Sequence, residues 1–114
     1  MSASRPISDQ VRHLLERGLG GEWPSSEQVA AGLAVSLQHL RRRLREEGTS
    51  ISQIREQILR DAAIASLAGG QEPVNELSAR LGFSEPSAFR RAFRRWTGKP
   101  PSAYRPGGGQ ERTG

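Results

Sequence analysis

The chain has 114 residues, of which 34% are hydrophobic, and its 17 basic and 12 acidic residues give a formal net charge of +5. Such a length holds about one small domain, or two half-sized units that share a connector, and it excludes a large enzyme core. The absence of cysteine excludes a disulfide framework and a cysteine-based metal site, which suits a reducing compartment. The sequence has neither the roughly 20-residue apolar run of a membrane span nor a signal-peptide pattern, so we expect a cytoplasmic protein without a membrane partner.

Arginine accounts for 16 of the 17 basic residues. The guanidinium group matches phosphate and guanine with two parallel hydrogen bonds, so this bias favours a nucleic acid as the partner. Genomic base composition also affects the arginine count, so composition alone leaves the partner open.

The first predicted helix follows a flexible tail over residues 1–7. Apolar residues recur at helical spacing from Val11 to Leu19, and glycines between Gly18 and Gly21 end the pattern. Trp23 then forms an extended corner with the proline after it, and we expect its ring to pack in the core.

A helix-turn-helix pattern comes next. A serine caps a short helix that ends near Gly32, and a tight turn follows at Ala34-Val35. Ser36 is the expected cap of a longer helix, which stops at Gly48. A short helix, a tight turn and a longer helix together form this motif.

The longer helix is amphipathic and carries arginines on its outer face. Leu37, Leu40 and Leu44 fall on the stripe that faces a core. On a wheel of 100° per residue the opposite side carries Gln38, Arg41, Arg42 and Arg45.

A long connecting helix is predicted after this motif. Thr49 or Ser50 is its expected start, and the pair Gly69-Gly70 ends it. Its length of about 18 residues corresponds to about 27 Å. A single apolar stripe along it comprises Ile51, Ile54, Ile58, Ala62 and Ala65.

The last third of the chain repeats the pattern. Gly82 supplies the positive φ of a sharp turn, and Ser84 is the expected cap of the next helix. Residues 102–105 form a last turn in which Tyr104 packs against the unit, and residues 107–114 have the composition of a disordered tail. The inward stripe of the helix comprises Phe89, Ala92, Phe93 and Trp96, and the outward stripe comprises Ser87, Arg90, Arg91 and Arg94.

The outward positions of the two arginine-rich helices correspond one to one. Each position in the second stripe lies 49 residues after its equivalent in the first, as Arg91 does after Arg42. For an isolated helix, a solvated basic face is the simpler interpretation. The duplication favours a shared function, and a connector of about 27 Å suits two helices in neighbouring major grooves, because one turn of B-DNA is about 34 Å.

Two motifs in the sequence resemble a known family. The segment LGFSEPSAFRRAFRRWTG, from Leu81 to Gly98, together with PSAYR, from Pro101 to Arg105, resembles the signature of AraC/XylS-type transcriptional regulators. The stretch from Leu40 to Ser50 is similar to the matching segment of the first motif. The resemblance covers about residues 8–106.

This resemblance implies an all-α fold of seven helices in a tandem helix-turn-helix arrangement. Two small three-helix units, at residues 8–50 and 70–106, are joined by a linker helix at residues 51–69. The implied partner is double-stranded DNA, bound sequence-specifically by two recognition helices in successive major grooves. The family's base-reading positions fall on Gln38, Arg41, Arg42, Pro86, Ser87 and Arg91, with Arg90 adjacent. We expect phosphate contacts from Ser36, His39, Arg45, Ser84, Arg94 and Arg95.

Two residues depart from the family's pattern. Pro86 stands where polar residues are frequent, and it offers only apolar contact, for example to a thymine methyl group. Ala34 stands where a turn glycine is common; because alanine at positive φ is strained, we expect a different geometry in the first turn. Many members of the family also have an N-terminal effector-binding or dimerisation domain, so we expect this chain to be a C-terminal domain without a small-molecule effector site.

A protein-interaction module and an enzyme are the two alternative classes of function. A protein-interaction module would contact RNA polymerase or a partner domain through its basic helices. An enzyme is disfavoured, because the sequence has no phosphate-loop motif, no cysteine nucleophile and no recognisable histidine–carboxylate spacing. We therefore expect no catalytic residue, no cofactor and no metal site.

Overall fold

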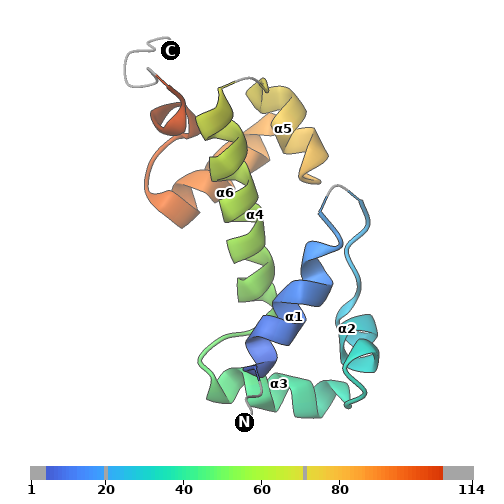
Figure 1. Ribbon diagram of the computed structural model, residues 1–114. Coiled ribbons are helices and arrows are strands. Elements are labelled where there is room, and N and C mark those ends of the chain that lie inside the picture. The colour runs from blue at the N-terminus through green and yellow to red at the C-terminus, as the bar shows by residue number, and fades with distance from the viewer. Residues whose placement is uncertain (1–4, 20, 71, 107–114) are drawn as a thin grey trace. The chain divides into compact units, whose positions relative to one another are not determined.

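The computed structural model describes residues 5–19, 21–70 and 72–106, and within these ranges every regular element is a helix. The predicted all-α class is confirmed. The predicted tail over residues 107–114 lies outside the described residues, as do residues 1–4 of the predicted N-terminal tail. In chain order the elements are α1 (Ile7–Glu16), α2 (Ser26–Gly32), α3 (Leu37–Glu46), α4 (Ile51–Gly69), α5 (Val74–Arg80), α6 (Pro86–Thr97) and the 3₁₀ helix η1 (Pro101–Tyr104), coloured in sequence in Figure 1.

The helices belong to two compact units whose boundary falls inside α4, between Ile58 and Leu59. Each unit has its own buried apolar residues. None of the helices in the described ranges has the length and apolar character needed to cross a bilayer.

The core of the first unit forms where α1, α2, α3 and the first half of α4 meet. Leu14, Trp23 and Leu37 pack against it while remaining partly exposed, so the predicted packing of Trp23 is confirmed. The buried residues are Ile7, Val11, Leu15, Val29, Ala30, Leu40, Leu44, Ile51, Ile54 and Ile58.

A carboxylate from the end of α3 holds the start of α1. Glu47 accepts hydrogen bonds from the backbone amides of Ile7 at 3.0 Å and Ser8 at 3.1 Å. These amides open a helix and have no carbonyl partner within it. Hydrogen bonding from the Ser8 side chain, and then from the two amides, holds the pKa of Glu47 below its usual value. The first helix is thus fixed to the segment that follows α3.

The second unit is built around an aromatic cluster. Phe89 and Phe93 on α6 are fully buried, and their ring centroids lie 5.7 Å apart. Tyr104 on η1 meets Phe93 edge to face, with centroids 5.2 Å apart, so the predicted packing of this last turn is confirmed. Trp96 is half-buried against Phe83 and Phe93. These rings fix the inward face of α6.

The predicted single stripe along α4 is wrong in its second half. Ile54 and Ile58 are buried as expected, but Ala62 is only half-buried and Ala65 is exposed. Ala63 and Leu67 are buried instead. The physical reason is that α4 contributes to two cores, and each core takes its own set of positions at helical spacing.

Candidate nucleic-acid interface

Both units contain the same helix-ending turn. The amide of Val35 donates to the carbonyl of Ala30 at 3.1 Å, and the amide of Phe83 donates to the carbonyl of Ser78 at 2.9 Å. Each of these bonds closes a Schellman motif, in which the residue before the donor adopts positive φ. Gly82 does so in the second unit, with φ 96°, as predicted.

The expectation of a different first turn is wrong. Ala34 has φ 60° and takes the left-handed conformation that Gly82 takes in the second unit. Its amide also donates to the carbonyl of Ala31 at 3.0 Å, as the amide of Gly82 does to that of Ala79. The two hydrogen bonds and the packing of α2 on α3 hold an alanine where a glycine has no strain.

The two arginine-rich helices start differently. Ser36 caps α3, because its Oγ accepts a hydrogen bond from the amide of His39 at 3.1 Å. The predicted cap at Ser84 is wrong: α6 begins at Pro86, its N-cap residue is Glu85, and no side chain caps it. Proline at the first helical position has a fixed φ and no amide hydrogen, so this helix start needs one hydrogen bond fewer.

The outer face of α3 matches the predicted stripe. Gln38, Arg41, Arg42 and Arg45 are exposed, while Leu40 and Leu44 face the core. The last of the predicted positions on this helix, His39, is half-buried.

Two arginines of α3 contact neighbouring side chains on the same helix. The Nη2 of Arg42 lies 3.0 Å from Nδ1 of His39, and since a guanidinium can only donate, the histidine nitrogen is the acceptor. Arg43, off the outer stripe, forms an ion pair with Glu46 at 4.0 Å. The remaining arginines of the stripe thus present their charge to solvent.

The outer face of α6 presents a second group of cations. Ser87, Arg90, Arg91, Arg94 and Arg95 are exposed, and Pro86 is half-buried. The buried aromatic residues on the opposite side fix which way this face points. The predicted outward stripes are therefore exposed on both helices, whereas His39 and Pro86 are half-buried.

One cation outside both helices was missed by sequence reasoning. Arg55, on α4, has its guanidinium carbon 5.7 Å from the ring centroid of Trp23. Its Nε is buried and has no hydrogen-bond partner among the described residues. Its position on the connecting helix gave no signal, because neither periodicity nor the repeat singles it out.

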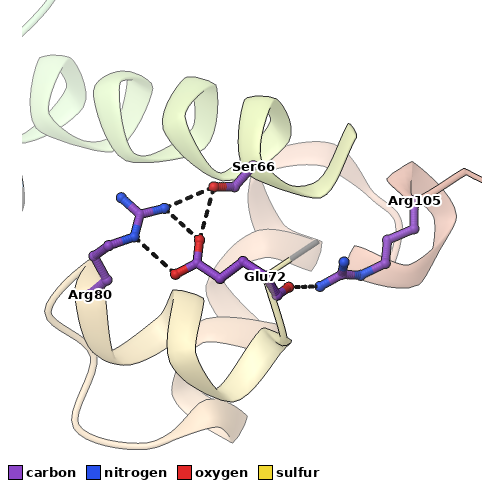
Figure 2. A network of polar contacts seen from close by, with 4 residues as sticks. All are labelled: Ser66, Glu72, Arg80 and Arg105. Carbon is purple, nitrogen blue, oxygen red and sulfur yellow. Dashed lines mark hydrogen bonds and ion pairs between the residues drawn. The ribbon is translucent and has the colours of Figure 1, made fainter. Parts of the chain in front are cut away.

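A polar network connects α5 to the end of α4 and to the segment after η1 (Figure 2). Arg80 donates to both carboxylate oxygens of Glu72, at 2.7 and 3.0 Å, and to the Oγ of Ser66 at 2.8 Å. Arg105, after η1, donates to the backbone carbonyl of Glu72. The network ties the end of α4, both ends of α5 and the segment after η1 together. The hydrogen bonds from Arg80 are the main reason why the pKa of Glu72 is lowered.

The described residues include histidine, aspartate and glutamate side chains, which can bind metal ions. Among them, no group of three or more histidine, aspartate or glutamate side chains is placed to hold a metal ion. The prominent polar surfaces are the arginine faces of α3 and α6.

Comparison with known proteins agrees with this arrangement. A family profile described as a helix-turn-helix domain matches residues 29–107. The ornithine utilization regulator of Pseudomonas aeruginosa is 44% identical over 96 residues, which cover 84% of this chain and 28% of that protein. This chain therefore spans less than a third of that relative's length.

Two solved structures share the fold. A DNA-binding transcriptional dual regulator from Escherichia coli K-12 superposes with a TM-score of 0.83 at 22% identity, covering 97% of this chain and 99% of that chain. A transcriptional regulator from Chromobacterium violaceum, described as having an AraC-type DNA-binding domain, gives a TM-score of 0.81 at 21% identity, covering 94% and 96%.

The family is one of DNA-binding domains that regulate transcription, not one of enzymes. The profile match runs from within α2 to just beyond η1, and the sequence signature between Leu81 and Arg105 lies within it. The chain belongs to the AraC/XylS-type family of helix-turn-helix transcriptional regulators.

Proposed function

We propose that this chain reads a specific sequence of double-stranded DNA with two recognition helices, α3 and α6, placed in successive major grooves. In this proposal α4 is the linker helix, and η1 is the seventh helix of the tandem arrangement. The observation that carries it is the duplicated motif. In each unit, a short helix, a Schellman turn and an arginine-faced helix follow one another with matching hydrogen bonds.

The base-reading residues of the first unit are Gln38, Arg41 and Arg42. All three are exposed on one face of α3, within its first two turns. Recognition helices contact base edges mainly through residues near their N-terminus, which favours these three over Arg45. We assign Ser36, His39 and Arg45 to phosphate contacts, because they flank this group on the same helix.

The base-reading residues of the second unit are Pro86, Ser87 and Arg91, with Arg90 beside them. Ser87 and Arg91 stand one turn apart on the exposed face of α6. Arginine pairs with guanine through two hydrogen bonds, so Arg91 is the strongest candidate for base specificity. We assign Ser84, Arg94 and Arg95 to phosphate contacts.

Replacing Arg91 by alanine tests this assignment. We expect Arg91→Ala to weaken binding to the preferred duplex by about 1–3 kcal/mol and to relax the preference at one base pair. The measurement is a binding titration against the preferred and the base-substituted duplexes over a salt series. Arg17→Ala is the matched control, since it removes an exposed arginine outside both recognition helices. Equal affinity of the wild-type chain for every sequence would contradict the proposal.

The preferred duplex comes from selection out of a random library. Two short conserved blocks about one helical turn apart, roughly 10 base pairs, are expected if both helices read bases. Recovery of a single block would assign base reading to one helix only.

The alternative of a protein partner, such as RNA polymerase, makes a different prediction. In that case Arg42→Ala and Arg91→Ala would abolish partner binding, and the wild-type chain would bind DNA without sequence preference. Loss of DNA binding with intact partner binding favours the DNA-reading function.

A further inference from the structure

A cleft of about 430 Å³ lies in the first unit, between the end of α3 and the start of α4. Three arginines line it, two from α3 and one from α4, and no carboxylate is among its lining residues. Hydroxyl groups from α2 and from the segment around the start of α4 also face it. The groups that bear on the argument are Arg41, Arg45, Arg55, Ser26, Thr49 and Ser52.

Arg55 lines this cleft, and its guanidinium group is oriented by a neighbouring ring. The Trp23 ring, 5.7 Å from the guanidinium carbon, holds the group by a cation–π contact. The buried Nε has no acceptor in the described part of the chain. Buried donors are normally satisfied, so the unpaired Nε of this cleft-lining residue calls for an acceptor that the described residues do not supply.

The start of α4 adds backbone donors to the same place. Ser50 satisfies one amide, because its Oγ accepts from the amide of Gln53 at 3.1 Å. The amides of Ile51 and Ser52 precede it, and the helix offers them no carbonyl. The N-terminus of a helix also has a partial positive charge, which attracts anions. Ser52 and Arg55 are three residues apart and therefore lie on the same side of α4.

These donors fit an oxyanion, and we propose that the cleft binds a phosphodiester group of the DNA backbone next to the groove that α3 reads. This inference rests on the proposed DNA-reading function. Arg41 and Arg45 belong both to the exposed face of α3 and to the cleft wall, so the two surfaces are continuous. In this proposal a duplex bound along α3 places its backbone near the end of that helix, where Arg45 lines the cleft.

Two variants test the cleft, each changing its charge in a different way. Arg55→Gln removes the oriented cation, and Ser52→Glu places a carboxylate in the cleft. Ser52 is exposed, and an acidic residue in the first turn favours helix formation, so the second variant keeps its fold even if the first does not. Gln57→Glu is the matched control, because it adds one negative charge to an exposed position of α4 outside the cleft.

The measurement is the affinity for the library-selected duplex and for a random duplex over a salt series, with thermal unfolding of each variant. Arg55→Gln and Ser52→Glu should weaken binding to both duplexes by about tenfold and reduce the log–log salt slope by about one, since one phosphate contact is lost. The base preference should not change. Gln57→Glu should retain the wild-type slope.

The outcomes separate this inference from the function on which it rests. If the wild-type chain binds its selected duplex specifically and both folded cleft variants keep its salt slope, the phosphodiester assignment is overturned while the function stands. If the wild-type chain has no sequence preference, the function itself fails. Inorganic phosphate alone provides a further arm, observed through the NMR signals of the Ser52 amide and the Arg55 Nε–H. Shifts in these signals together with unchanged slopes would identify a site for free anions and overturn the DNA assignment.

Discussion

Ala34 occupies a backbone conformation that residues with a β-carbon seldom adopt. Its φ of 60° is needed because the amide of the next residue, Val35, bonds back to Ala30. The left-handed conformation costs an L-residue about 1–2 kcal/mol, and glycine has no such cost. The first turn therefore stores strain that Gly82 avoids in the second.

Replacing Ala34 by glycine should stabilise the chain. The relief of strain exceeds the added entropy of the unfolded chain, for a net gain of about 0.5–1 kcal/mol in the free energy of unfolding. Chemical denaturation measures it. Ala31→Gly is the control: it lies in the regular part of α2, so it should destabilise by about 0.5–1 kcal/mol. A destabilised Ala34→Gly would show that the turn is not strained.

The helix caps show what the sequence could and could not predict at this scale. Ser36 was identified correctly, because a serine directly before an amphipathic run is a strong cap signal. The cap predicted at Ser84 on the same kind of signal is wrong, although Pro86 indicated the correct start. Proline favours the first helical position, which makes Glu85 the residue before the helix. At this helix start the conformational preference of Pro86 sets the cap position, and the position equivalent to Ser36 in the repeat does not.

At the scale of helices, α4 could be predicted in extent but not in the faces it buries. A single periodic stripe through Ile54 and Ile58 extends to Ala62 and Ala65 on a helical wheel. The buried residues switch to Ala63 and Leu67 because the second unit packs on other positions. Periodicity identifies an amphipathic helix with one core, and it has no means of showing that a second core begins partway along.

The Glu72 network makes the second unit sensitive to acid. A glutamate whose pKa is lowered in the folded state stabilises the fold above its ordinary pKa, near 4.5, and this stabilisation is lost as the pH falls through the lowered value. We expect the melting temperature of Glu72→Gln to be lower than that of the wild-type chain at about pH 7, because Arg80 loses its charged partner. The difference should shrink as the pH falls below 4.5 and protonates this carboxylate in the folded state.

Circular dichroism melts across that pH range measure the effect. Glu22→Gln removes an exposed carboxylate outside the network and should stay within about 0.5 kcal/mol of the wild-type chain at neutral pH. A difference between Glu72→Gln and wild type that is constant with pH would mean that the charge of Glu72 does not stabilise the fold.

At the scale of the whole chain, each arginine-faced helix is supported by a core of its own. Leu40 and Leu44 anchor α3 in the first core, and Phe89 and Phe93 anchor α6 in the second. The fold class, the order of elements and the outward arginine faces were all predictable, since they follow from periodicity. The contact between Arg55 and Trp23 was not, because the two residues are 32 positions apart in the sequence and only folding brings them together.

A substitution that shortens a buried side chain in one core should test whether the two units unfold separately. Leu77→Ala removes a fully buried side chain of the second unit and should cost about 2–5 kcal/mol. Native-state hydrogen exchange should then show lost protection in α5 and α6, with protection in α1, α2 and α3 retained. Leu15→Ala is the mirror experiment in the first unit, with the opposite pattern. Equal loss across all helices in both variants would show that the chain unfolds as a single cooperative unit.

Glu47 has a mechanical consequence. Its carboxylate fastens the first amides of α1, at Ile7 and Ser8, to the residue directly after α3. A pull on the backbone at Ile7 is therefore transmitted to the end of α3 through two hydrogen bonds, in addition to the packed core to which Ile7 belongs. The start of α1 is thus mechanically coupled to α3, the helix proposed to read DNA in the first unit.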